Sequence, residues 1–339
     1  MGVTLKTIHS ISINRIFTQA TREIMNGATV SPKRIHTKEL LAPKIILEDP
    51  QNRIVTFIDR STDIFYAIGE LFWYLSGSNS LDHIAYYAPS IINYSDDNKT
   101  LNSAYGYNIF YKWVNQWEEC KRILLSDNDS RRAIIFIREP SDLTKITKDS
   151  VCTNTMHFLI RENKLYLIVN MRSNDFYVGF IFDVFCFTML QELMSIELNI
   201  KLGSYIHIAN SLHIYENWLD VASKIVKSQL KQMIGKMKPM YFCSNVQNEI
   251  ADILKYEQMI RTEPIEIIHL IEEDLYNTIL ISSYWTDILL VLVFKRYFSK
   301  GDYNKCKLII KHLAYNSNNN LFIELLRRKL VAKSQKIKK

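Results

Sequence analysis

The first 220 residues mix helical and strand-like hydrophobic spacing. Apolar residues recur at helical intervals over 62–75, and 182–197 is apolar almost all round, which predicts two helices, the second one buried. A further helix is expected over 108–125, after a polar loop over 76–103. Short apolar runs predict strands over 131–137, 156–160, 165–171 and 203–210, the middle two forming a hairpin. This mixture predicts an α+β fold.

From about residue 216 the pattern changes to amphipathic helices with lysine-rich faces. We therefore expect an α+β domain over 1–220 and a helical extension over 221–339. Residues 327–339 hold seven of the 42 basic residues and no acid, so the rest of the chain carries 35 basic and 35 acidic side chains. A neutral body argues against nucleic-acid binding, and the basic tail is expected to be disordered.

Sparse cysteines and short apolar runs exclude several classes of protein. The five cysteines include no CxxC pair, which argues against a structural zinc site and a disulfide framework. The longest apolar run, 288–294, is too short to span a membrane, and the N-terminus has no signal-peptide pattern. We expect a cytoplasmic protein without a metal site.

One cysteine and three arginines stand where reactive chemistry would need them. Cys152 lies just before a predicted strand, where it is either a small buried apolar residue or a nucleophile activated by nearby cations. Arg131, Arg132 and Arg172 lie at strand ends. Guanidinium groups with the hydroxyl of Ser173 suit a phosphate dianion, and surface salt bridges are the simpler alternative.

Asp183 and His213 are the other polar candidates. A carboxylate inside the apolar helix 182–197 is costly to bury unless it is paired, which favours a functional role for Asp183. His213 and Tyr215 follow a strand, where core packing alone would explain them.

Taken together, these residues lie in segments that resemble the thymidylate synthase superfamily over residues 22–220. The matching segments are GELFWYLSG (69–77), AYG (104–106), DNDSRR (127–132), the Cys152 segment, RSNDFYVGFIFD (172–183) and HIY (213–215). The resemblance implies a mixed β-sheet packed with helices in a catalytic domain over 1–220. Residues 221–339 would be an added helical extension with no assigned role.

The resemblance implies covalent catalysis on a pyrimidine nucleotide. Cys152 would add to C6 of the base, with Arg172 favouring its thiolate form. C5 would then attack the one-carbon unit of 5,10-methylenetetrahydrofolate, the co-substrate. Glu70 would organise water and proton transfer at the base, and Tyr105 would lie near C5, where a proton leaves.

Other positions would bind the two substrates. Arg172 and Ser173 would hold the nucleotide phosphate, together with Arg131 and Arg132 reaching across a homodimer interface. The remaining expected contacts are Lys33 or Arg34 with the phosphate, His213 and Tyr215 with the sugar 3′-hydroxyl, and Asp175 and Gly179 with the folate pterin.

Asp183 departs from the uracil-specific synthases, which carry asparagine at this position. A carboxylate accepts a hydrogen bond from N4–H₂ of cytosine and can pair with a protonated N3, so Asp183 favours a cytosine base. The change resembles that in the deoxycytidylate and cytidylate hydroxymethylases. We therefore predict a hydroxymethyltransferase acting on dCMP or CMP, in which water captures the exocyclic methylene intermediate and tetrahydrofolate is released.

Two alternatives stay open. A C5-methylase would reduce the same intermediate with folate hydride, and a non-catalytic homologue would only bind nucleotide. The joint presence of Cys152, Glu70 and Tyr105 argues against the non-catalytic homologue. The tryptophans that synthases place against the folate are missing from 88–97, and Thr153 replaces the histidine after the nucleophile; both departures fit a non-synthase. The choice between ribose and deoxyribose is also open.

Overall fold

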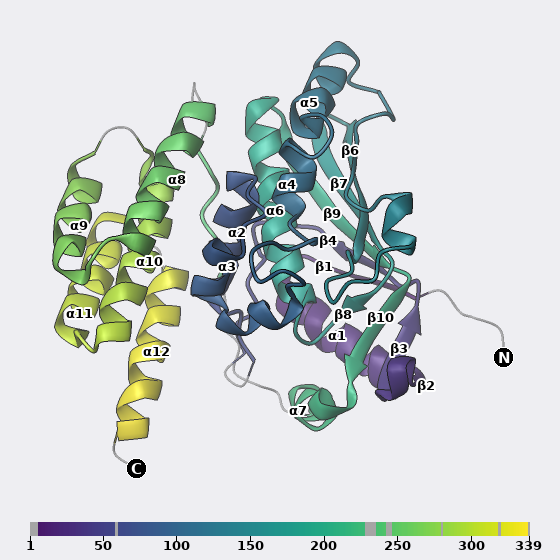
Figure 1. Ribbon diagram of the computed structural model, residues 1–339, viewed down its shortest axis with the longest axis horizontal. Helices are drawn as coiled ribbons and strands as arrows, with labels where there is room; N and C mark the ends of the chain where they lie inside the picture. Colours follow the sequence, from purple (N-terminus) through teal and green to yellow (C-terminus); the bar gives the residue numbers. More distant parts are fainter. Residues whose placement is uncertain are drawn as a thin grey trace.

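Strands and helices alternate along the body of the chain, and helices alone follow it. The computed structural model describes residues 6–57, 60–227, 235–241, 246–278, 281–317 and 320–337. Within them the chain forms a six-stranded sheet, a four-stranded sheet, helices packed on the larger sheet and a group of C-terminal helices (Figure 1). The α+β prediction is confirmed.

The six-stranded sheet has the order β1-β4-β9-β7-β6-β5. Its strands, in chain order, are β1 (Thr7–Ser10), β4 (Lys44–Leu47), β5 (Ile134–Phe136), β6 (Thr153–Arg161), β7 (Lys164–Met171) and β9 (Lys201–Ala209). The predicted hairpin is confirmed: β6 and β7 pair antiparallel around Glu162 and Asn163, both with positive φ. β7 and β9 pair in parallel, which requires a crossover, and the apolar helix α6 (Phe180–Glu197) lies in that crossover.

The four-stranded sheet has the order β2-β3-β10-β8. Its strands are β2 (Ala28–Val30), β3 (Thr37–Leu41), β8 (Asn174–Asp175) and β10 (Ser211–Tyr215). In this register His213 of β10 lies opposite Glu39 of β3 and Asp175 of β8. Backbone pairing therefore places polar residues from three distant parts of the chain side by side.

The helices of the body pack on the sheets or on other helices of the body. They are α1 (Ile13–Met25), α2 (Ile64–Ser76), α3 (Leu81–Tyr87), α4 (Tyr105–Phe110), α5 (Gln116–Ser126), α6 and α7 (Glu216–Lys227). α2 begins after Asp63, whose side chain accepts a hydrogen bond from the backbone N–H of Phe65. It ends at Gly77, which has the left-handed φ of 61° that favours glycine.

Two of the expected element boundaries are wrong. The expected loop over 76–103 contains α3, because the Ser80 side chain caps a helix whose inner face is buried. The expected helix over 108–125 is instead α4 and α5 with a break between them, because Asn115 caps α5 by accepting from the backbone N–H of Glu118. Capping side chains inside polar stretches thus decide both boundaries.

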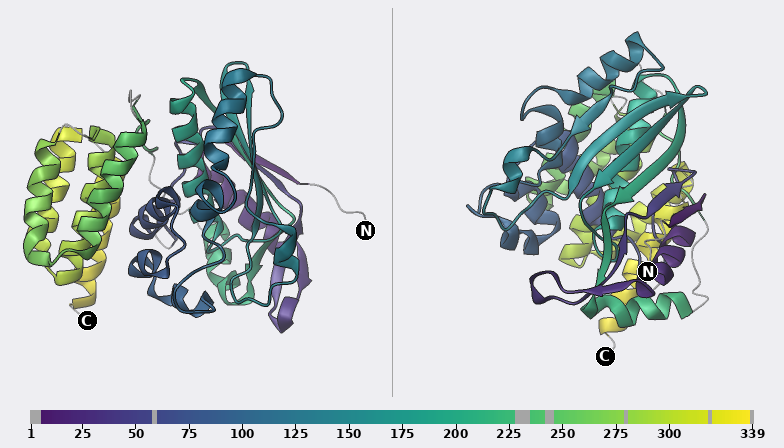
Figure 2. Two further views of the ribbon diagram at one scale, coloured as in Figure 1. Left: turned by 45° about the horizontal axis from the view of Figure 1, so that its top comes forward. Right: turned by 90° about the vertical axis from the view of Figure 1, so that its right-hand side faces the viewer.

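The C-terminal helices form a bundle against α2 and α3. They are α8 (Val246–Thr262), α9 (Ile268–Asn277), α10 (Ser283–Lys300), α11 (Tyr303–His312) and α12 (Asn320–Ile337). In Figure 2 the bundle, the layer containing α2 and the sheet follow one another. α10 is buried along most of its length rather than amphipathic: its Phe294 stacks on Phe65 of α2 with ring centroids 6.0 Å apart, and Trp285 lies 6.2 Å from Phe72. None of the helices in the described part of the chain has the length and apolar composition of a membrane span.

The expectation of a disordered basic tail over 327–339 is wrong through residue 337, which ends α12. Phe322 and Leu326 of the same helix are buried and anchor it. Arg328 then donates to the backbone carbonyl of Thr56 at 2.9 Å. The apolar residues upstream of the charges keep this stretch helical and attached to the body.

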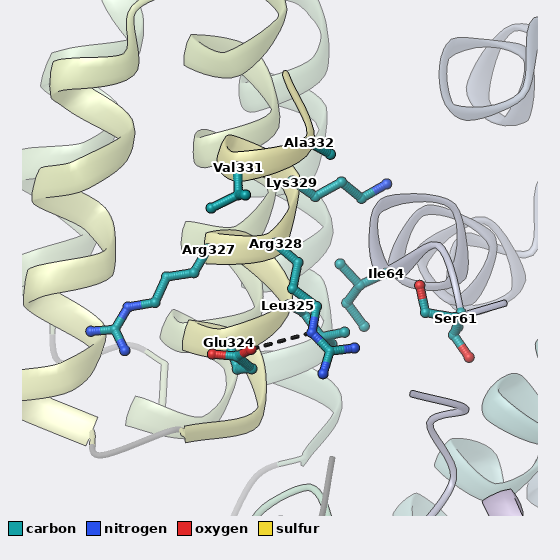
Figure 3. Close-up of a pocket in the computed structure, with 10 residues that line it drawn as sticks. Ser61, Ile64, Glu324, Leu325, Arg327, Arg328, Lys329, Val331 and Ala332 are labelled. Carbon is teal, nitrogen blue, oxygen red and sulfur yellow. Dashed lines mark hydrogen bonds and ion pairs between the residues drawn. The ribbon is translucent and has the colours of Figure 1, made fainter. Parts of the chain in front are cut away.

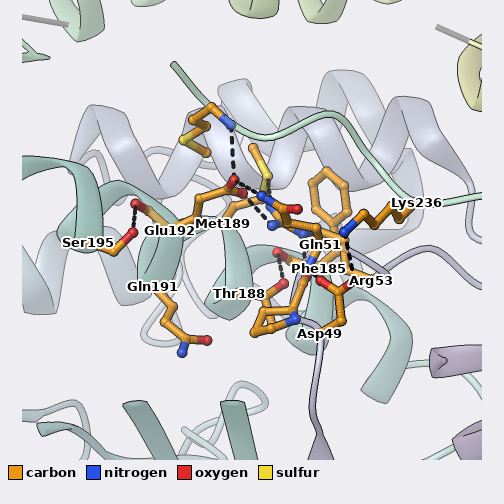
Figure 4. A network of polar contacts seen from close by, with 12 residues as sticks. Asp49, Gln51, Arg53, Phe185, Thr188, Met189, Gln191, Glu192, Ser195 and Lys236 are labelled. Carbon is orange, nitrogen blue, oxygen red and sulfur yellow. Dashed lines mark hydrogen bonds and ion pairs between the residues drawn. The ribbon is translucent and has the colours of Figure 1, made fainter. Parts of the chain in front are cut away.

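A buried carboxylate ties the segment 235–241 to the body (Figure 4). Glu192 of α6 accepts hydrogen bonds from Arg53, from Gln51 Nε2 at 2.8 Å and from the backbone N–H of Met240 at 2.9 Å. The Arg53 side chain is fully buried, and breaking such an ion pair would leave one charge uncompensated. The hydrophobic core runs from the body into the bundle without interruption, and the predicted domain boundary stays a prediction.

Gly69 allows a tyrosine ring to lie directly against the backbone of α2. A Cβ at Gly69 would stand 2.2 Å from the ring of Tyr87. The Tyr87 hydroxyl donates to Glu257 of α8 at 2.7 Å, and Arg261 donates to the same carboxylate. Tyr87 therefore joins α2 to the C-terminal bundle.

Gly69→Ala is expected to lower the free energy of unfolding by about 1–3 kcal/mol, because the new methyl group displaces the Tyr87 ring. Urea denaturation measures the change. Gly235→Ala is the matched control, since a Cβ there comes no closer than 3.9 Å to Leu321. Equal stability of the Gly69→Ala and wild-type proteins would contradict this account of the contact.

Candidate active site

A cavity of about 540 Å³ lies where the ends of the two sheets meet. Five site residues predicted from the sequence line it: Cys152, Arg172, Ser173, His213 and Tyr215. The structure therefore brings the predicted nucleophile, phosphate contacts and sugar contacts together. Glu39, Lys148 and Ser211 also line the cavity, and sequence reasoning missed them.

Strand pairing places the Cys152 thiol beside the Arg172 guanidinium. Thr153 at the start of β6 pairs with Met171 at the end of β7, so the residues just beyond them are neighbours. Arg172 Nη2 lies 3.4 Å from Cys152 Sγ, and Arg172 Nε donates to the Val151 carbonyl at 2.8 Å. Burial raises the pKa of the Cys152 thiol, whereas Arg172 favours the thiolate.

The four-stranded sheet supplies the opposite wall. The Ser211 hydroxyl donates to Glu39, and Ser211 Oγ lies 3.4 Å from His213 Nδ1. The His213 and Tyr215 rings meet edge to face, 5.0 Å between centroids. The pairing of Glu39 with His213 follows from strand register, which no local sequence signal reveals.

Two carboxyl groups with raised pKa values lie next to this region. Burial raises the pKa of Glu70 to about 8, and the charge of Asp183 adds to the rise. Burial raises the pKa of Asp183 to about 7, against a hydrogen bond from Asn174 Nδ2 at 2.7 Å. The Tyr66 hydroxyl donates to Glu70 at 3.0 Å. Carboxyl groups that titrate near neutral pH are suited to proton transfer.

The Tyr105 hydroxyl is fixed close to the predicted nucleophile. It accepts a hydrogen bond from the backbone N–H of Thr153, the residue after Cys152, at 3.3 Å. The Tyr105 ring packs between Tyr74 and Phe187, with centroids 5.5 and 6.1 Å away. The role of Tyr105 near C5 of a bound base stays a prediction.

Asp175 and Gly179, the predicted pterin contacts, lie just before α6. Asp175 Oδ1 accepts from the backbone N–H groups of Tyr177 at 3.0 Å and Val178 at 3.1 Å, and burial raises its pKa. A Cβ at Gly179 would stand 3.7 Å from Asp183 Oδ2, so both positions border the acidic region. Their role toward folate stays a prediction. Among the described residues, no cluster of histidine, cysteine and acidic side chains is arranged to hold a metal ion.

Three predicted arginines are not gathered into the cavity of the single chain. Arg34, Arg131 and Arg132 are exposed and are not among its lining residues. Arg34 precedes the lining residue Ile35, and the side chain of Lys33 lies outside the described residues. The delivery of Arg131 and Arg132 from a second protomer stays a prediction.

A second cavity, of about 730 Å³, lies between α12 and the start of α2 (Figure 3). Ser61 and Ile64 line one side, and α12 lines the other. In Figure 3 Lys329 points toward α2 and Arg327 points away from it. None of the site residues predicted from the sequence lines this cavity.

The two raised pKa values predict a pH-dependent stability. The folded protein holds protons on Glu70 and Asp183 up to about pH 8 and 7, whereas the ordinary values are 4.5 and 3.8. Because the native state binds more protons in that window, their contribution is complete below about pH 4 and is lost as the pH rises. The loss between pH 5 and 8 is expected to be about 2 kcal/mol, less than full burial would give, since both side chains are half-buried.

Denaturation curves of the wild type and of Glu70→Gln/Asp183→Asn at pH 5 and 8 measure this contribution. The double variant is expected to lose less stability than the wild type between the two pH values. Parallel behaviour of the two proteins would show that other groups govern the change.

The arrangement of sheets and helices is that of a thymidylate synthase fold. The structure is similar to that of the thermostable thymidylate synthase A from Bacillus subtilis, with a TM-score of 0.57 and 21% identity over 65% of this chain and 86% of that one. A sequence model of the family described as thymidylate synthase matches residues 15–261. The chain belongs to the thymidylate synthase family, which confirms the resemblance found in the sequence.

Several relatives are phage hydroxymethyltransferases. A deoxyuridylate hydroxymethyltransferase of Delftia phage PhiW-14 is 31% identical over 210 residues, 58% of each chain. One of Bacillus phage SP01 is 28% identical over 60% of this chain and 56% of that protein. A deoxycytidylate 5-hydroxymethyltransferase of Enterobacteria phage T6 is 30% identical over 58% of this chain and 86% of that protein. This chain thus spans less than two thirds of the two deoxyuridylate enzymes.

Proposed function

We propose that this protein hydroxymethylates C5 of a cytosine mononucleotide, dCMP or CMP, with 5,10-methylenetetrahydrofolate as the one-carbon donor. The observation that carries the proposal is Asp183, a carboxyl group held by Asn174 beside the region of Cys152. Its oxygens suit the N4–H₂ of cytosine. Similarity to an enzyme described as deoxycytidylate 5-hydroxymethyltransferase supports the same chemistry.

Cys152 begins the proposed reaction. Its thiolate, favoured by Arg172, adds to C6 of the base and makes C5 nucleophilic toward the methylene carbon. Tyr105 and Glu70 assist removal of the C5 proton, since the Tyr105 hydroxyl is fixed near Cys152 and Glu70 titrates near neutral pH. Loss of the C5 proton expels tetrahydrofolate and leaves an exocyclic methylene group on C5. Water then adds to this methylene group, and elimination of the Cys152 thiolate from C6 releases the 5-hydroxymethyl nucleotide.

A homodimer would complete the phosphate site. Along β7 every second residue is buried and the others are mostly half-buried, so one face of the larger sheet is less well covered. That face suits a second copy of the chain, which would bring Arg131 and Arg132 to the phosphate held by Arg172 and Ser173. Asp175 and Gly179 would contact the pterin beside α6.

Deoxyuridylate is the second candidate substrate. Two relatives are described as deoxyuridylate hydroxymethyltransferases. The pKa of Asp183, about 7, also allows a protonated carboxyl group, which would donate to O4 of uracil.

A competition assay tests the proposal. CMP, dCMP and dUMP are mixed equally with methylenetetrahydrofolate, and product mass and dihydrofolate absorbance are followed together. We expect gain of CH₂O on a cytosine nucleotide without dihydrofolate. Gain of CH₂ with dihydrofolate would instead make the protein a methylase, and absence of any product would favour a nucleotide-binding homologue.

A further inference from the structure

A line of hydrogen bonds leads from Asp183 into the core, away from the cavity. Asn174 Nδ2 lies 2.7 Å from Asp183 Oδ2, and Asn174 Oδ1 lies 3.1 Å from His207 Nε2. His207 Nδ1 lies 2.9 Å from the Tyr205 hydroxyl. Asn174 is buried, and His207 and Tyr205 are fully buried. We refer to Tyr205, His207, Asn174 and Asp183 as the buried polar chain.

Tyr205 stands at the buried end of the buried polar chain. Its hydroxyl group determines which atom donates in each hydrogen bond of the buried polar chain. Within the described residues the Tyr205 hydroxyl has one hydrogen-bond partner, His207. A buried hydroxyl hydrogen without an acceptor is costly, so Tyr205 donates and His207 Nδ1 accepts. Burial lowers the pKa of His207 to about 3, so the ring is neutral and carries its one proton on Nε2.

The His207 tautomer also determines which side-chain atom of Asn174 faces Asp183. Because His207 Nε2–H donates to Asn174 Oδ1, the amide nitrogen of Asn174 must face Asp183. The reverse orientation would place two acceptors, Asn174 Oδ1 and Asp183 Oδ2, against each other. Asp183 Oδ2 therefore receives an N–H, which favours the ionised, accepting form of Asp183 and opposes the rise in pKa caused by burial.

Packing keeps the buried polar chain in this arrangement. Tyr205 and His207 stand two residues apart on β9 and so share its inward face. The Phe180 and His207 rings meet edge to face, with centroids 5.2 Å apart.

We propose that Tyr205, His207 and Asn174 are positioning residues that hold Asp183 as a hydrogen-bond acceptor and thereby select cytosine over uracil. The inference rests on the proposed function, because it assigns the base contact to Asp183. An acceptor satisfies N4–H₂ of cytosine, whereas the O4 atom of uracil would face an oxygen without an intervening proton.

Three substitutions and one control variant test whether the buried polar chain positions Asp183. Tyr205→Phe removes the donor at the buried end, which frees the imidazole to move its proton to Nδ1 and lets the Asn174 amide turn. His207→Leu interrupts the chain. His207→Gln restores it, because a glutamine accepts from Tyr205 through its oxygen and donates to Asn174 through its nitrogen. Tyr256→Phe is the control, since it removes a tyrosine hydroxyl bonded to Asp274 in the C-terminal bundle.

Dissociation constants for dCMP and dUMP are measured by calorimetry without folate, so that binding is separated from turnover. We expect the ratio of the dUMP to the dCMP constant to fall about tenfold in Tyr205→Phe and His207→Leu, and to be retained in His207→Gln and Tyr256→Phe. An unchanged ratio in folded Tyr205→Phe protein would overturn the inference and leave the proposed function standing. Wild-type protein that binds neither nucleotide would overturn both.

The direction of the hydrogen bonds in the buried polar chain can also be measured without a ligand. Nitrogen-15 NMR of labelled histidine distinguishes a proton on Nε2 from one on Nδ1. We expect Nε2–H for His207 in the wild type and a shift toward Nδ1–H in Tyr205→Phe. A wild-type His207 protonated on Nδ1 would overturn the inference whatever the protein binds.

Discussion

Cys152→Ala is expected to lower kcat with a cytosine nucleotide by about 10⁴-fold or more, because the covalent bond to C6 cannot form without the thiol. Nucleotide affinity should change little. The phosphate and sugar contacts assigned to Arg172, Ser173 and His213 line the cavity independently of the sulfur atom. Single-turnover kinetics and calorimetry measure the two effects.

A second cysteine provides the control. Cys120 is buried in α5 and is not among the cavity residues, so Cys120→Ala should keep kcat close to that of the wild type. Product formation by Cys152→Ala at a rate near that of Cys120→Ala would eliminate covalent catalysis by Cys152.

Asp183→Asn is expected to move the preference from cytosine to uracil nucleotides by about 10²-fold or more in the ratio of kcat/KM values. The neighbouring amide explains the direction of the change. Asn174 Nδ2 donates to position 183, so an asparagine there would turn its oxygen toward Asn174 and its N–H₂ toward the base. That N–H₂ group donates to O4 of uracil and meets N4–H₂ of cytosine without an acceptor.

Asp82→Asn is the control for the loss of one negative charge. Asp82 is exposed and lies in the first turn of α3. This control should keep the wild-type ratio of kcat/KM values. The same ratio in Asp183→Asn as in the wild type would show that another residue chooses the base.

Five of the thirteen cavity residues are predicted from the sequence, because they lie in motifs with recognisable neighbours. Cys152 and Arg172 stand at the two ends of a hairpin whose strands and turn are both visible in the sequence. Glu39 was missed because its place beside His213 depends on the pairing of β3 with β10, strands far apart in the chain. His207 was missed because an inward-facing histidine in an apolar strand looks like any other core residue.

Among the elements of the fold, those with a regular local pattern are also the ones that the sequence predicts. The buried helix α6 and the hairpin are predicted from periodicity, because each buries its residues in a regular pattern. α3 was missed because side-chain capping by Ser80 is a single-residue signal within a polar stretch. The helical state of 327–337 was missed because the prediction rested on the charges of this segment. The buried apolar residues that anchor the helix precede the segment in α12.

The position of α2 between the body and the C-terminal bundle has a consequence for synthesis of the protein. Phe65 and Phe72 of α2 leave the ribosome long before Trp285 and Phe294 of α10, which cover them. At about 5–20 residues per second, the nascent chain keeps this apolar surface open for about 10–45 s. Since Glu70 lies on the same helix, we expect this part of the candidate site to be fully packed only after α10 has left the ribosome.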